Sequence, residues 1–96
     1  MIRLTMTEAL RAAARRCVWF EPPEQAILQP ARLAAYIFTY GSFEDTKALR
    51  DQIGVDELRE LLDQAPPGIF DPRSWAYWNL MADRFTPPPL PERSLG

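Results

Sequence analysis

The chain has no histidine, so neither imidazole catalysis nor a histidine-based metal site is open to it. Cys17 is the single cysteine, which excludes an internal disulfide framework and a cysteine-based zinc site. Only four glycines occur, and they form no glycine-rich phosphate loop. We therefore expect a protein that is not an enzyme and that needs no metal and no cofactor.

Long apolar runs and a strong net charge are also missing. No run approaches the roughly 18 apolar residues of a membrane span, so we expect none. Arg11, Arg15 and Arg16 interrupt the apolar stretch that a signal peptide needs. The formal net charge of −2 is too small to imply a polyanionic partner or a membrane surface. Together these features predict a reduced, cytoplasmic protein.

An apolar segment at about 31–40 organises the rest of the chain. Wound as a helix, it is polar only along the strip that holds Arg32 and Thr39, and such a helix is buried by other elements. Pro30 suits the first helical position, and Gly41 suits the left-handed position just past a helix end. The fold class that we predict is all-α: a compact bundle of four to five short helices around this central apolar helix.

Before the central helix, the chain predicts one helix and an extended segment. Thr5 and Glu8 have the spacing of a capping box, and the helix that follows runs to about Cys17. The cysteine lies on the apolar stripe of this helix and is expected in the core. Trp19 and Phe20 precede two prolines, which favour extended backbone, and we expect their rings to plug the end of the core.

After the central helix, the chain predicts a helical hairpin and a last helix. Ser42 caps a helix that Gly54 ends, and the next helix runs from about 57 to 64. Asp71 caps the last helix, at 72 to about 85. The apolar stripe of the first hairpin helix consists of Phe43, Thr46, Leu49 and Ile53.

The last helix carries two apolar faces, and one of them is hard to bury. The core face consists of Trp75, Trp78, Ala82 and Phe85. The second face, Tyr77 and Met81 with Leu80 beside them, has the aromatic and methionine character that protein interfaces favour. Alternatively, this face packs on the loop at 66–67, and the end of the chain folds back or stays disordered. We predict one helical domain at 1–85 and a Pro-rich C-terminal tail at 86–96.

The predicted partner-binding site combines this second face with the tail. A proline-rich segment loses little conformational entropy when it docks into a groove, and arginine matches carboxylates in a bidentate manner. The residues assigned to the site are Tyr77, Leu80, Met81, Arg84, Pro87, Pro88, Pro89, Leu90 and Arg93.

Nucleic-acid binding is the alternative function that the sequence raises. The hairpin at 43–64 is a helix-turn-helix in the geometric sense, but it contains seven acids and three bases, a balance of −4. Such a helix pair would be repelled from phosphate. Residues 1–20 hold four arginines and one glutamate, a balance of +3. A DNA-binding transcriptional regulator would use the helix-turn-helix or, more readily, this basic first helix.

Four stretches, in their order, carry a resemblance to a known group: WFEP at 19–22, YIFTYGSFED at 36–45, Leu49 with Gly54, and DPRSWAYW at 71–78. The chain resembles small, mostly uncharacterised bacterial helical proteins encoded beside AbiEii-type nucleotidyltransferase toxins. Its tail and its loop at 66–67 depart from the pattern of the group.

The resemblance implies a toxin–antitoxin system in which this chain is the antitoxin or an accessory partner. It would be a non-catalytic protein-binding module that binds and restrains a nucleotidyltransferase-like toxin. The resemblance implies no site residues. The sequence leaves open the identity of the partner, the oligomeric state (a homo-oligomer included), the order of the tail and the conformation of 18–24.

Overall fold

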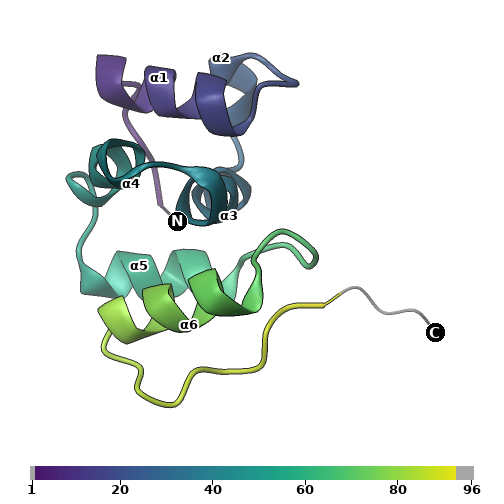
Figure 1. Ribbon diagram of the computed structural model, residues 1–96. Coiled ribbons are helices and arrows are strands. Elements are labelled where there is room, and N and C mark those ends of the chain that lie inside the picture. The colour runs from purple at the N-terminus through teal and green to yellow at the C-terminus, as the bar shows by residue number, and fades with distance from the viewer. Residues whose placement is uncertain (1, 93–96) are drawn as a thin grey trace.

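In the computed structural model, the described part of the chain, residues 2–92, forms six α-helices and no strand (Figure 1). This confirms the all-α bundle, with one more short helix than expected because 23–26 forms a single helical turn. The helices are α1 (Glu8–Cys17), α2 (Pro23–Ala26), α3 (Pro30–Tyr40), α4 (Phe43–Arg50), α5 (Val55–Asp63) and α6 (Pro72–Met81). None of them, within residues 2–92, has the length and apolar character that crossing a bilayer requires.

The central helix is α3, which packs against every other helix of the bundle. In Figure 1, α1 and α2 lie above it, α4 lies beside it, and α5 and α6 lie below. Its buried residues are Leu33, Ala34, Ala35, Ile37 and Phe38. This confirms the prediction that an apolar helix at about 31–40 forms the centre of the bundle. Packing on several sides stabilises this arrangement, because it removes most of the apolar surface of the helix from water.

Gly41 ends α3, but the predicted reason for a glycine is wrong. Its φ of −78° and ψ of 158° are extended, not left-handed. A Cβ atom at this position would lie 2.6 Å from the carbonyl oxygen of Ile37 and 2.9 Å from the Cβ of Asp45. Glycine is therefore needed for the close approach of the end of α3 to α4, rather than for its freedom in φ.

The N-terminal cap of α1 also differs from the prediction. Thr7, not Thr5, is the cap, and its hydroxyl accepts a hydrogen bond from the N–H of Leu10 at 3.0 Å. The backbone of Thr5 is instead bonded to the side-chain amide of Gln52, which accepts from its N–H at 2.7 Å and donates to its carbonyl at 2.9 Å. The capping-box prediction is wrong because this pairing holds the chain before α1 against the end of α4.

Four aromatic residues expected in the core lie wholly or partly at the surface. Trp19 is 79% exposed and Phe20 46% exposed, because α1 ends at Cys17 and Val18 fills the core instead. Phe43 is 73% exposed and Phe85 is 82% exposed.

The position of Phe85 follows from the way α6 ends. Asp83 has a φ of 62°, and the N–H of Arg84 donates to the carbonyl of Asn79 at 2.8 Å. This left-handed residue, closed by a hydrogen bond between residues five apart, is a Schellman ending, which turns the chain out of the helix. The prediction that the helix continues to about 85 is wrong, because the ending falls on an aspartate rather than on the glycine that usually marks it.

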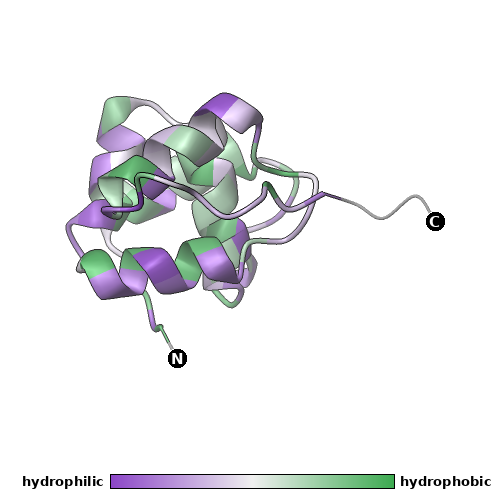
Figure 2. Cartoon of the chain, turned by 90° about the horizontal axis from the view of Figure 1, so that it is seen from below, coloured by the Kyte–Doolittle hydropathy of each residue, from purple (hydrophilic) through white to green (hydrophobic). Residues whose placement is uncertain are grey.

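The two tryptophans of α6 anchor it to the rest of the molecule. The ring of Trp78 stacks on Phe38 with 4.0 Å between centroids, and its indole N–H donates to the carbonyl of Phe38 at 3.0 Å. The indole N–H of Trp75 donates to the carbonyl of Pro88 at 2.8 Å. In Figure 2, the chain after α6 crosses in front of the helices. The described part of the tail thus folds back over α6.

Candidate protein-docking groove

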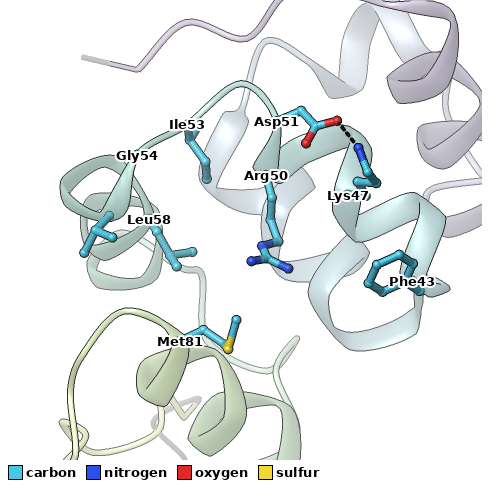
Figure 3. Close-up of a pocket in the computed structure, with 9 residues that line it drawn as sticks. Phe43, Lys47, Arg50, Asp51, Ile53, Gly54, Leu58 and Met81 are labelled. Atoms are coloured by element: carbon cyan, nitrogen blue, oxygen red, sulfur yellow. Dashed lines mark hydrogen bonds and ion pairs between the residues drawn. The ribbon is translucent and has the colours of Figure 1, made fainter.

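Two adjoining hollows open beside α4, each with a volume of about 370 Å³. The first is lined by α4, the turn after it, α5 and Met81 of α6, and the second is lined by α4, α6 and the end of α3. They share Phe43 and Arg50; one also includes Met81, and the other includes Tyr77. Figure 3 shows the first hollow, with Arg50 and Met81 reaching into the space between the helices. We call the two hollows together the α4–α6 groove, and its main lining residues are Phe43, Arg50, Arg73, Tyr77, Trp78 and Met81.

Phe43 faces outward because of how α4 begins. Ser42 caps the helix: its hydroxyl accepts from the N–H of Asp45 at 3.3 Å, and its own N–H donates to the Asp45 carboxylate at 3.0 Å. This capping box turns Asp45 into the interior, where only 3% of it is exposed. Asp45 follows Phe43 by two residues, which is a rotation of about 200° around the helix axis. The inward aspartate therefore places the phenylalanine ring on the opposite, solvent side.

Arg50, the last residue of α4, lies over the edge of the core. Its guanidinium carbon is 5.8 Å from the ring centroid of Trp78, a cation–π distance. Its neighbour Lys47 pairs with Asp51 at 2.7 Å, shown by the dashed line in Figure 3. Arg50 forms no ion pair with any residue from 2 to 92. Its charge is consequently left facing the groove.

The α6 wall of the groove is built from residues one helical turn apart. Tyr77 is 51% exposed, and its ring stands edge-on to Trp78 with 5.1 Å between centroids. Met81 is partly buried and packs against the core. Leu80 is 50% exposed on the same helix. The second apolar face of α6 is thus exposed to solvent at Tyr77 and Leu80, and it is partly buried at Met81.

The two arginines predicted to meet a partner have different outcomes. Arg84 donates from both terminal nitrogens to the carboxylate of Asp63, at 2.7 and 2.8 Å, and ties the end of α6 to α5. This guanidinium holds the pKa of the Asp63 carboxyl below its usual value. Arg84 is thus engaged within its own chain. Arg93 lies outside the described residues.

The proline part of the predicted site is exposed but fastened. Pro87, Pro88 and Pro89 are exposed, and Pro88 accepts the hydrogen bond from Trp75. Leu90 is partly buried and packs against the core. The tail is therefore a covering segment along α6 in this structure, and its role in docking stays a prediction.

The basic first helix has less available charge than its sequence indicates. Arg11 forms an ion pair with Glu24. Arg16 forms one with Asp45, with 3.0 Å between Nε and the nearer carboxylate oxygen. A phosphate backbone would compete with these carboxylates for the same guanidinium groups. Of the three arginines of α1, Arg15 is exposed and forms no ion pair with a residue of the described part of the chain.

Cys17 is a core residue, as predicted, and is 6% exposed. Burial raises the pKa of its thiol to about 11, and the nearby Asp45 carboxylate adds to the rise. The thiolate is the reactive form of cysteine, so this side chain is a poor nucleophile near neutral pH. Across residues 2–92 there is also no group of three or more side chains suited to holding a metal ion.

Sequence reasoning missed Phe43, Arg50 and Arg73 as groove residues. Phe43 is expected on the apolar stripe of α4, because the sequence does not show that Asp45, which pairs with the distant Arg16, is buried. The arginines did carry a signal. Neither has an acid three or four residues away, whereas Lys47 has Asp51 at i+4.

Comparisons of the chain with protein-family models, with curated proteins and with solved structures give no match.

Proposed function

We propose that this protein is a non-catalytic binding module that docks onto a nucleotidyltransferase-like toxin as its antitoxin or accessory partner. The docking surface is the α4–α6 groove with the adjacent exposed side of α6. The observation that carries the proposal is the exposure of Phe43 and Tyr77 on either side of one groove. Single exposed apolar residues are ordinary on protein surfaces, but aromatic residues gathered with arginine are enriched in interfaces.

The proposed mechanism is steric. A module that lies against the toxin with α6 and the tail would cover the substrate cleft or hold the toxin in an inactive arrangement. The rigid attachment of α6 supports this role, since Trp78 fixes it to α3 and the Arg84–Asp63 pair fixes its end to α5. A surface that is ordered before docking loses less entropy on binding. The sequence resemblance supports the class of the partner.

The test is complex formation with the nucleotidyltransferase-like protein encoded beside this one. The two chains are co-expressed and analysed by size-exclusion chromatography with light scattering. We expect a stable complex for the wild type and a weakened one for Phe43→Ser with Tyr77→Ser. The matched control is Leu28→Ser, since Leu28 is 69% exposed on a loop away from the groove. Absence of a wild-type complex would overturn the proposal.

A further inference from the structure

The α4–α6 groove is positively charged on a chain that is negative as a whole. Its charged lining residues are Lys47, Arg50, Asp51 and Arg73, which sum to +2, against −2 for the whole chain. Lys47 and Asp51 neutralise one another at 2.7 Å. The charge offered to a ligand is therefore that of the two arginines.

Neither arginine is paired with a carboxylate in the part of the chain that the structure describes. The acid closest in sequence to Arg73 is Asp71, and its carboxylate accepts the N–H of Ser74 at 2.6 Å as the cap of α6. This hydrogen bond and, to a smaller extent, the nearby charge of Arg73 lower the pKa of Asp71, but the two side chains form no ion pair. Arg50 is held beside the Trp78 ring. Both guanidinium groups keep their donors for a carboxylate from outside, and arginine binds that group through two parallel hydrogen bonds.

Apolar surface lies directly beside this charge. Phe43 and Tyr77 flank the hollow that contains both arginines, and Met81, Val55 and Leu58 continue the apolar lining into the other hollow. An amphipathic helix laid in a groove presents side chains at intervals of one turn. A ligand that fits these features has apolar side chains on one side and carboxylates next to them.

We infer that the groove binds an acidic amphipathic helix of the partner, with a carboxylate at Arg50 and Arg73 and apolar side chains against Phe43 and Tyr77. This rests on the proposed function and names the chemistry of the partner segment. Nucleic acid fits less well, because affinity for a polyanion comes from several phosphate contacts. Among the described residues, the groove offers two unpaired cations, Arg50 and Arg73, and the exposed Glu44 lies on α4 next to Phe43.

The probe is a pair of synthetic helical peptides of equal length with identical leucine faces, one flanked by glutamates and the other by lysines. Each is titrated into the isotope-labelled full chain and followed by NMR. We expect the glutamate peptide to shift the amide signals of Phe43, Arg50, Arg73 and Tyr77, and the lysine peptide to leave them unchanged. Raising the salt concentration should weaken the binding, because the contact is electrostatic.

Charge reversal sharpens the test. Arg50→Glu with Arg73→Glu should weaken the glutamate peptide about 10- to 100-fold, since each charge-assisted hydrogen bond contributes more than a neutral one. Arg73→Glu alone changes an exposed residue in the first turn of α6, so it tests the charge even where the double variant does not fold. It should weaken binding about 10-fold. Arg15→Glu, on the exposed side of α1, is the control and should keep wild-type affinity.

In the experiments on the chain without the toxin, three results overturn the inference: equal binding of both peptides, unchanged affinity after charge reversal, or a single-stranded oligonucleotide that shifts the same signals more strongly. If the toxin complex forms and its affinity is unchanged by Arg50→Glu with Arg73→Glu, the inference is wrong and the proposed function still holds. A glutamate peptide that binds when no toxin complex forms removes the proposed function and leaves the groove chemistry standing.

Discussion

The two faces of α4 differ in how they use charge. On the inner face, Asp45 is buried and its carboxylate is paired with Arg16, so that the contact with α1 is satisfied within the chain. On the outer face, Arg50 has an aromatic ring beside it and no carboxylate in the described structure. One short helix thus carries a closed structural contact and an open binding surface. Changes on the inner face should therefore affect stability, and changes on the outer face should affect binding.

The largest effect is expected for Gly41→Ala on the inner side. The added Cβ would lie 2.6 Å from the carbonyl oxygen of Ile37, which belongs to the helix backbone and not to a flexible side chain. We expect a loss of about 2–4 kcal/mol in the free energy of unfolding, measured by urea denaturation. The matched control is Gly54→Ala, whose Cβ would meet nothing closer than the Glu57 carboxylate at 3.8 Å. Its cost should stay below about 1 kcal/mol, and equal costs would contradict the steric account.

Next in size is Asp45→Asn, which removes the charge that Arg16 faces. The expected loss is about 1–3 kcal/mol, because hydrogen bonds to a charged group are the stronger ones. The control is Asp51→Asn, which breaks the exposed pair with Lys47 on the outer side of the same helix. That loss should be about 0.5 kcal/mol or less. Thermal unfolding of both variants checks the comparison, which fails if Asp51→Asn costs as much.

The inner face should also contribute to the response to acid. Arg16 holds the pKa of the Asp45 carboxyl below its ordinary value of 3.8. A lowered pKa adds stability above pH 3.8 that is lost as the pH falls through the value in the folded protein. The thermal midpoint should fall by several degrees between pH 5 and pH 2. Asp45→Asn should flatten this slope, whereas an unchanged slope would assign the acid response to other carboxylates.

The smallest effect on stability is expected for Phe43→Ser with Tyr77→Ser in the groove. Both side chains are at least half exposed, so the free energy of unfolding should change by less than about 1 kcal/mol. The same pair should reduce partner binding. A large drop in the thermal midpoint would place these rings in the structural part of the molecule and remove the distinction between the two faces of α4.

The sequence predicted those features that depend on neighbours along the chain. The apolar surface of α3 required burial, and Ser42 and Asp71 cap helices through residues three positions on. The failures occurred at helix ends, one of which depends on a distant contact and the other on a local conformation that its residue type does not indicate. Thr5 lost its predicted cap role to a pairing with Gln52, 47 residues away. Phe85 left the core because α6 ends at a left-handed aspartate, for which no local pattern is specific.

The candidate site shows the same division. Tyr77 and Leu80 could be identified as hard to bury, because α6 carries more apolar residues than one face can hold. Phe43 could not be identified, since its outward position depends on the inward turn of Asp45 toward Arg16, 29 residues earlier in the chain. Arg84 was assigned to a partner because its ion pair with Asp63 spans 21 residues and leaves no trace in local spacing.

The hydrogen bond from Trp75 to the carbonyl of Pro88 makes the fluorescence of this tryptophan sensitive to the position of the tail. If the tail is lifted from α6, a mostly buried indole N–H loses its acceptor, which costs about 1–3 kcal/mol unless another acceptor replaces it. A partner that binds the tail must therefore supply a hydrogen-bond acceptor for the indole N–H of Trp75, or the ring becomes accessible to water. Release of the tail would then shift the emission of Trp75 to longer wavelength.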